Sequence, residues 1–385
     1  MKAAVVGTGA VACKRWYGER TAHELSLEVI RLALHDAHLL PRDIDGLYTT
    51  QIGWFAPQEK FLAQRMAETL GCRTNAQLEA ECGGASALVA FRRAVDDVEQ
   101  GRVNAALVWA ADVELPRKNL DVTRHLHIIE QARTFYGPYA AAYGVVAVVA
   151  LYAMSAQAYM HRYGLSPEQV AGLVVMLRGH GTRHPLAFLR EEVTVEDVLA
   201  SRMVSPPLHM LECAPWCDGA AAVVVTRDST GVGVTTIAEA HDATSFAPLS
   251  GNMWTYDNAR RAANEAYGKA GIGASDIDVA EVYGAFGVTE LQLYEELGFA
   301  RPGEAAALVR DGRMTYGGHL VVNPSGGRIA FGHPPYATPL YELVEVVEQL
   351  RGRAHGRQVQ RARLGLVHAE HGMVNGSVVA ILNAA

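Results

Sequence analysis

The chain has 385 residues, of which half are hydrophobic and 19% are charged, and its formal net charge is −7 at pH 7. This length suffices for two core-bearing domains or one large fused unit. The negative charge and the lack of a Lys/Arg-rich run argue against a nucleic-acid-binding protein. The five cysteines are an odd number, which favours reduced thiols over a disulfide framework.

The N-terminal segment MKAAVVGTGA predicts a core strand followed by a turn. Its apolar run is too short for a secretory signal, and its glycines lack the Gly-x-Gly-x-x-Gly spacing of a dinucleotide-binding loop. Farther along, the apolar stretch from Tyr143 to Met160 is interrupted by glycine, serine, glutamine and tyrosine. We therefore expect a buried helix there rather than a membrane span, and a soluble, cytoplasmic protein.

The stretch LEAECGGASA, from Leu78 to Ala87, places Cys82 before two glycines at the expected start of a helix. A thiol at a helix start faces unpaired N–H groups and the positive end of the helix dipole, which predicts a lowered pKa. The glycines let the backbone approach a thioester closely. Cys82 is therefore a candidate nucleophile. The alternative is a small buried side chain at a tight turn.

Residues 114–211 form a long stretch with weak strand signals and broken helical patterns, rich in aromatic residues, histidine and arginine. An insertion of this size is often a lid over a site, and the alternative is a dimerisation or packing element. After it, Cys213 and Cys217 stand four residues apart and lead directly into the strand-like AAAVVVT. Because a zinc site would need a second pair of ligands, we interpret both cysteines as core thiols and expect no metal site.

Two regions of the chain repeat one order of elements. LEVIRLALHDAHLLPRDIDGLYTTQIG and RRAANEAYGKAGIGASDIDVAEVYGAFG each give a helix, a break, the triplet Asp-Ile-Asp and a strand-like segment. The alternation predicts an α/β fold of two duplicated halves, built of layered sheets and helices. We expect an N-terminal half at 1–113, a lid-like insertion at 114–211 and a C-terminal half at 212–385. The closing strand of the first half is expected near the start of the last segment.

Five motifs in order make the chain resemble the thiolase superfamily, most of all its sterol-carrier-protein-type, lipid-transfer-like branch. They are EAECGGASA around Cys82, CDGAAAVVVT at Cys217, EVYGAFGVTELQLYEELGF at Glu281, NPSGGRIAFGHP at Asn323 and the C-terminal HAEHGMVNGSVVAIL. The resemblance spans nearly the whole chain and implies a thiolase-like fold.

The resemblance also implies roles for individual residues. Cys82 would accept the acyl group, while His333 would take the thiol proton and later hydrogen-bond the thioester oxygen. The family carries a second cysteine or a histidine as acid/base in its C-terminal motif. Counting back from Gly372 puts Glu370 at that position, and a slip of one residue puts His371 there. The N–H groups of Cys82 and Gly372 would hold an oxyanion.

Tyr283, in VYGAF, stands where the family has asparagine or histidine. Steroid side-chain aldolases of the superfamily carry a tyrosine there but lack the reactive cysteine, whereas this chain keeps Cys82 and His333. We therefore expect a degradative thiolase that cleaves a 3-oxoacyl-CoA through a cysteine acyl-enzyme, with coenzyme A as co-substrate. A retro-aldolase acting on a 3-hydroxyacyl-CoA side chain and a non-catalytic acyl-CoA- or lipid-binding subunit are the alternatives.

Partners follow from the resemblance alone. It implies a homodimer, and it raises a small zinc-ribbon and OB-fold protein as a partner subunit. We expect no permanently bound cofactor. The residues that bind coenzyme A, the acyl chain and the direction of the reaction are left open by the sequence.

Overall fold

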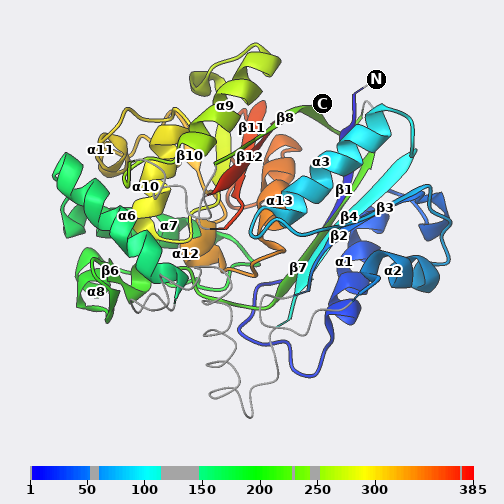
Figure 1. Ribbon diagram of the computed structural model, residues 1–385, viewed down its shortest axis with the longest axis horizontal. Coiled ribbons are helices and arrows are strands. Elements are labelled where there is room, and N and C mark those ends of the chain that lie inside the picture. Colours follow the sequence, from blue (N-terminus) through cyan, green and yellow to red (C-terminus); the bar gives the residue numbers. More distant parts are fainter. Residues whose placement is uncertain (1, 53–59, 114–146, 228–229, 243–251, 373–374) are drawn as a thin grey trace.

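The structure is a computed structural model that describes residues 2–52, 60–113, 147–227, 230–242, 252–372 and 375–385 (Figure 1). A ten-stranded sheet runs through it in the order β10-β9-β11-β12-β8-β1-β7-β4-β2-β3. Five strands belong to one end of the sheet: β1 (Ala4–Ala10), β2 (Gly46–Thr50), β3 (Ala76–Ala80), β4 (Ala105–Asp112) and β7 (Gly219–Thr226). The other five are β8 (Val232–His241), β9 (Val279–Val282), β10 (Val321–Val322), β11 (Leu364–Glu370) and β12 (Gly376–Asn383).

The two ends of this sheet have the same topology. In the first, β2 pairs in parallel with β3 and β4, and β7 pairs antiparallel with β4 and β1. In the second, β9 pairs in parallel with β10 and β11, and β12 pairs antiparallel with β11 and β8. A short antiparallel ladder between β1 and β8 joins them. The predicted duplicated α/β fold is therefore confirmed. Because β7 lies inside the first set, we propose that the second half begins after β7.

The triplet Asp-Ile-Asp does the same work in both halves. Its first aspartate ends a 3-10 turn, at Pro41–Asp43 and at Ala274–Asp276, and accepts a backbone hydrogen bond at 2.8 Å in each. The isoleucine is fully buried in both. The second aspartate, Asp45 or Asp278, accepts the N–H groups at the start of β4 or β11. The repeated triplet thus determines where the corresponding strand begins in each half.

Helices cover both faces of the sheet. They are α1 (Ala22–Asp36), α2 (Leu62–Leu70), α3 (Ser86–Glu99), α6 (Val148–Tyr163), α7 (Pro167–Arg183), α8 (Val195–Ala200), α9 (Asp257–Ala270), α10 (Gly287–Glu296), α11 (Ala305–Arg310), α12 (Gly327–Phe331) and α13 (Thr338–Leu350). The corresponding helices α3 and α13 contact each other between the two halves (Figure 1). One apolar core joins these two helices to strands of both halves, and separate cores lie beneath α1 and α9.

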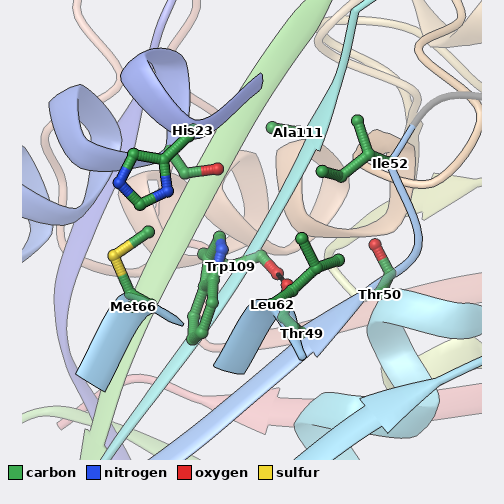
Figure 2. Close-up of a pocket in the computed structure, with 9 residues that line it drawn as sticks. His23, Thr49, Thr50, Ile52, Leu62, Met66, Trp109 and Ala111 are labelled. Carbon is green, nitrogen blue, oxygen red and sulfur yellow. Dashed lines mark hydrogen bonds between the residues drawn. The ribbon is translucent and has the colours of Figure 1, made fainter. Parts of the chain in front are cut away.

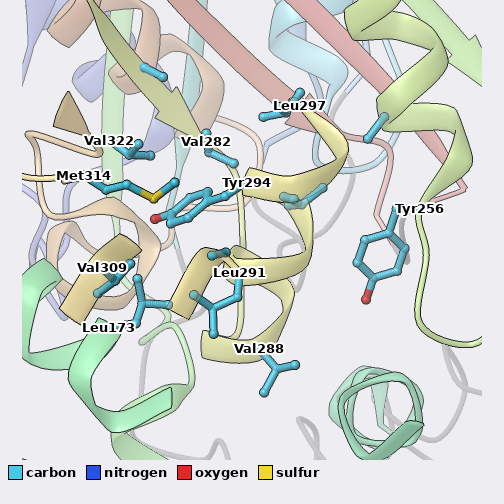
Figure 3. Packing of buried hydrophobic residues seen from close by; sticks show 14 of the residues in the cluster. Leu173, Tyr256, Val282, Val288, Leu291, Tyr294, Leu297, Val309, Met314 and Val322 are labelled. Carbon is cyan, nitrogen blue, oxygen red and sulfur yellow. The ribbon is translucent and has the colours of Figure 1, made fainter. Parts of the chain in front are cut away.

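The described part of the insertion is more regular than the sequence predicts. It contains the long helices α6 and α7, the short α8 and a hairpin of β5 (Met203–Ser205) and β6 (Leu208–His209). The expectation of broken helices is wrong here, because Leu173 of α7 and its neighbours bury a full apolar face against α10 and α11 (Figure 3). The aromatic stretch at 133–144 lies outside the described residues. The described helices include none that is both long enough and apolar enough to span a membrane.

Candidate active site

Cys82 lies in the turn between β3 and α3, before the first helical residue, Ser86. Its N–H donates to Ser86 Oγ at 2.8 Å, and that hydroxyl donates to the carbonyl oxygen of Gly83 at 2.6 Å. The cysteine is half-buried. The serine thus fixes the backbone of a turn that leaves its cysteine partly open to solvent.

The environment of the thiol differs from the expectation. Burial raises the pKa of Cys82, and the carboxylates of Glu239 and Glu81 raise it further. The predicted lowering of this pKa is therefore wrong. The effect of a helix dipole is confined to the first turn, and Cys82 precedes that turn while the two carboxylates act on it directly. The thiol consequently needs a base at the moment its sulfur attacks.

The two glycines after Cys82 let the halves of the molecule meet. A methyl group on Gly83 would lie 2.0 Å from the carbonyl oxygen of His371, and one on Gly84 would lie 2.7 Å from Tyr283 Oη. The same methyl group on Gly84 would lie 2.9 Å from the carbonyl oxygen of Glu370. The turn that contains Cys82 therefore contacts two motifs of the second half. In the sequence, the two glycines are the only sign of this close contact.

We expect Gly83→Ala to destabilise the protein by roughly 2–4 kcal/mol, because it combines a left-handed backbone with a steric overlap. Gly83 has φ +58°, and its added methyl would collide with a backbone oxygen. Gly71→Ala is the matched control, since Gly71 has φ +66° but nothing within 4 Å. Denaturant unfolding should show about 1 kcal/mol for the control. Equal losses for both variants would show that the contact with His371 contributes nothing.

Tyr283 and His333 form a buried pair, with Tyr283 Oη and His333 Nε2 2.6 Å apart. Burial, and after it the Arg328 guanidinium, lowers the pKa of His333 to about 3. Burial, and after it the charge of Glu370, raises the pKa of Tyr283 well above its usual range. At neutral pH the pair is therefore an uncharged imidazole hydrogen-bonded to a phenol. The phenolic oxygen of this pair lies beside Gly84, with the unprotonated imidazole behind it.

Glu370 and His371 point to different partners. Glu370 is buried at the end of β11, where its Oε1 accepts a hydrogen bond from Tyr152 Oη at 2.7 Å. The ring of His371 turns to Glu239, with 3.3 Å between His371 Nε2 and Glu239 Oε1. The backbone carbonyl oxygens of His371 and Glu370 are among the nearest atoms to methyl groups placed on Gly83 and Gly84.

The two amides predicted to hold an oxyanion are placed differently. A methyl group on Gly372 would lie 3.7 Å from the Gly84 nitrogen, so Gly372 is beside the Cys82 turn. The N–H of Cys82, however, is already bonded to Ser86 Oγ. It could stabilise an oxyanion only by giving up that bond.

Arg328 is a residue that the sequence-based reasoning missed. It is fully buried in α12, with Nη2 3.2 Å from Glu342 Oε1, and its guanidinium lies 5.4 Å from the centre of the Tyr283 ring. A cation here disfavours a second positive charge on His333 and so keeps that imidazole neutral. The signal available in the sequence was an arginine inside the apolar and glycine-rich run GGRIAFG.

Cys213 and Cys217, interpreted from the sequence as core thiols, both pack into the protein, and the Cys217 N–H donates to the His333 carbonyl oxygen at 3.4 Å. Cys217 is buried and Cys213 is partly buried against the core around α10.

A cavity of about 20 Å³, room for a single water molecule, lies between α1, α2 and the outer face of β2 and β4 (Figure 2). The adjacent Tyr48 points to the opposite face, where it donates to Asp97 of α3. The sheet therefore separates this cavity from the Cys82 turn.

The chain has relatives among known proteins. Residues 238–384 match the family model described as Thiolase C-terminal domain-like. The chain is 33% identical over 344 residues to an acetyl-CoA acetyltransferase of Methanothermobacter thermautotrophicus, covering 87% of this chain and 88% of that protein. It is 34% identical over 228 residues to the benzoylsuccinyl-CoA thiolase subunit BbsB of Thauera aromatica, covering 57% and 59%. Sterol carrier protein 2 of Rattus norvegicus is 36% identical over 229 residues, covering 57% and 42%.

A solved structure named Ltp2-ChsH2(DUF35) aldolase superposes with a TM-score of 0.85 at 25% identity, covering 100% of this chain and 98% of that one. The fold and its connectivity are therefore shared with a protein that carries an aldolase name, as well as with relatives that carry thiolase names.

Proposed function

The chain belongs to the thiolase superfamily and is an acyltransferase of that family, and from this premise we propose that it cleaves a 3-oxoacyl-CoA with coenzyme A through an acyl intermediate on Cys82. One observation carries the proposal. The Cys82-Gly83-Gly84 turn of the first half meets Tyr283 and the end of β11 in the second half. The candidate nucleophile and the Tyr283 hydroxyl, which is hydrogen-bonded to His333, thus come to one junction between the halves, and this supports the proposal.

The chemistry proceeds in two balanced steps. The Cys82 thiol loses its proton toward the Tyr283–His333 pair, and the sulfur attacks the C3 carbonyl of the substrate. The C2–C3 bond then breaks, the acyl group stays on sulfur, and the electron pair leaves as an enolate that takes up a proton at C2. In the second step the thiol of coenzyme A gives its proton to the carboxylate that protonated the enolate and displaces the acyl group from Cys82, whose sulfur takes back the proton held by the Tyr283–His333 pair.

We propose Glu370 rather than His371 as the group that protonates the enolate. The Glu370 side chain is buried and bonded to Tyr152, whereas the His371 ring is engaged by Glu239. Oxyanions along the path would be stabilised by Tyr283 Oη and the Gly372 amide. Acyl-CoA is the proposed substrate class, and a homodimer and cytoplasmic location stay predictions.

A retro-aldolase is the second candidate, and the Tyr283–His333 hydrogen bond and the superposition on an aldolase favour it. The two reactions differ in their need for a thiol acceptor. A 3-hydroxyacyl-CoA offered without free coenzyme A would give a shorter acyl-CoA and a carbonyl product from an aldolase. A thiolase would leave it intact, and would cleave a 3-oxoacyl-CoA only after coenzyme A is added.

A small partner subunit also belongs to the proposal. One relative is named as a subunit of a thiolase, and the aldolase structure is named for Ltp2 together with ChsH2(DUF35). By analogy we propose that this chain works with a second, smaller protein.

Tyr283→Phe is expected to lower kcat by about 10²–10⁴-fold, the usual contribution of a positioned acid or base. The variant keeps the ring but removes the hydroxyl that bonds His333. Tyr267→Phe is the control, since it removes another buried hydroxyl, which donates to the Leu297 carbonyl oxygen at 2.8 Å. Turnover is measured on whichever thioester the wild type cleaves. A Tyr283→Phe enzyme as active as the Tyr267→Phe enzyme would remove the proton-transfer role.

A further inference from the structure

Three metal-ligand side chains meet at one end of β8. Glu239 and His241 stand two residues apart on that strand, so both project from the same face. His371 directly follows β11, and its N–H donates at 2.9 Å to the carbonyl oxygen of Gly376, which pairs with His241. One ligand atom from each residue lies within 4.8 Å of the others. We propose that Glu239, His241 and His371 bind a divalent transition-metal ion, with Zn²⁺ as the best-matched ion.

The geometry of the three side chains supports a shared ion. Glu239 Oε1 lies 2.7 Å from His241 Nε2 and 3.3 Å from His371 Nε2. Ligands of a tetrahedral zinc ion, each about 2.0–2.1 Å from the metal, are separated by roughly 3.3 Å. The two imidazole rings stand at 90° with their centres 4.4 Å apart. Small side-chain rotations would therefore place all three atoms around one ion.

Gly376 makes room for the two imidazoles. A methyl group at that position would lie 2.9 Å from His241 Nδ1 and 2.9 Å from His371 Cγ. Any other residue would push one of the rings out of the cluster. The two imidazole rings therefore require a residue without a side chain at position 376.

The burial of His371 and the contact between Glu239 and Arg92 also fit a metal-binding site. The His371 side chain is only 9% exposed, and its buried Nε2 faces Glu239 Oε1 at 3.3 Å. The other carboxylate oxygen of Glu239 accepts a hydrogen bond from Arg92 Nη1 at 2.6 Å, which holds Oε1 toward the histidines. Such outer contacts orient the ligands of metal sites. His241 is 55% exposed, so an ion can enter and keep a water ligand.

The donor set selects the class of ion. Two imidazole nitrogens and one carboxylate oxygen suit Zn²⁺ and its neighbours better than Mg²⁺ or Ca²⁺, which prefer oxygen ligands alone. A bound ion would tie β8 to the segment after β11, whose His371 carbonyl packs on Gly83. The site would therefore brace the Cys82 turn from one side, and it does not depend on which reaction that turn performs.

The test is a zinc titration of the full, EDTA-treated chain by calorimetry, with thermal unfolding as a second readout. We expect one Zn²⁺ per chain and a raised Tm, and Mg²⁺ should do neither. His241→Ala and the more conservative His241→Gln should each weaken binding by at least about 100-fold, since each removes one of three ligands. His355→Ala is the matched control, because His355 is exposed in a turn outside the cluster.

Two results would overturn the inference. The wild type could fail to bind Zn²⁺, which would leave the cluster as a pair of imidazoles around one carboxylate. Alternatively, both His241 variants could bind Zn²⁺ as tightly as the His355 variant, which would place the ion elsewhere, for instance on cysteine thiols. Both readouts are independent of catalysis, so an inactive but zinc-binding wild type would leave the site standing.

Discussion

Cys82→Ala is expected to abolish the covalent acyl-enzyme and to lower thiolytic turnover by roughly 10⁴-fold or more, because the variant has no atom to carry the acyl group. The fold should survive, since the residue is only half-buried and its fixed contact to Ser86 uses the backbone N–H. Intact-mass spectrometry after mixing with a 3-oxoacyl-CoA, without free coenzyme A, detects the adduct. Turnover with coenzyme A is measured in parallel.

Cys72→Ala is the matched control for this prediction. Cys72 is also a half-buried thiol, and burial raises its pKa as well. The control variant should keep both the adduct and the turnover of the wild type. A Cys82→Ala enzyme that still cleaves a 3-oxoacyl-CoA would refute the acyl-enzyme scheme, and one that has lost only thiolysis while cleaving a 3-hydroxyacyl-CoA would favour the aldolase.

The raised pKa of Cys82 predicts how the thiol responds to pH. Alkylation by iodoacetamide should increase toward alkaline pH with a midpoint above the ordinary thiol value of about 8.5, because two carboxylates oppose the thiolate. Replacing Glu239 with glutamine removes one of those charges and should move the midpoint down. This contrast tests the electrostatic cause directly.

The sequence predicts those features that depend on local chain geometry. The repeated Asp-Ile-Asp triplet sets the start of a strand in each half, and the glycines after Cys82 allow a close backbone approach. The residue types alone indicate both features. The duplicated order of elements likewise predicts two halves of equal topology. The residue types are visible in the sequence, whereas their partners Ala105, Leu364 and His371 are visible only in the structure.

The sequence does not predict features that depend on distant partners. The direction of the His371 side chain is set by Glu239, which is 132 positions away (371 − 239). The pKa of Cys82 is raised by burial and, after it, by the same carboxylate. Arg328 of α12 and Glu342 of α13 form their ion pair across the segment 332–337 that joins the two helices, and neither residue belongs to a recognisable spacing. Long-range charge pairs of this kind require the folded coordinates.

The Arg328 guanidinium is a positive charge buried next to Tyr283 of the candidate site. Arg328 is surrounded by the fully buried carboxyl groups of Glu281, Glu290 and Glu342. Burial raises the pKa of all three above the ordinary value, and for Glu281 the pKa reaches about 8, while the arginine lowers each of them. Burial thus keeps these three carboxyl groups near their neutral form, and the arginine is the cation that lowers the pKa of each.

Arg328→Met is therefore expected to lower the free energy of unfolding by about 3–5 kcal/mol, because it leaves buried carboxyl groups without their counter-charge. The loss should be larger at pH 8 than at pH 6. Carboxyl groups whose pKa is raised in the folded state stabilise it most at low pH, and that contribution declines as pH rises through the folded pKa. Removing the arginine raises these pKa values further, so more of the stability at high pH is lost.

The double variant Arg328→Met/Glu342→Leu distinguishes a missing counter-charge from a missing packing volume. Replacing both members of a buried ion pair by apolar groups is often close to neutral, so the double variant should recover most of the loss seen in Arg328→Met. Denaturant unfolding of the three proteins at both pH values measures this coupling. If the double variant is as unstable as the single one at pH 8, the arginine acts through its shape and not its charge. His333 would then keep its low pKa through burial alone.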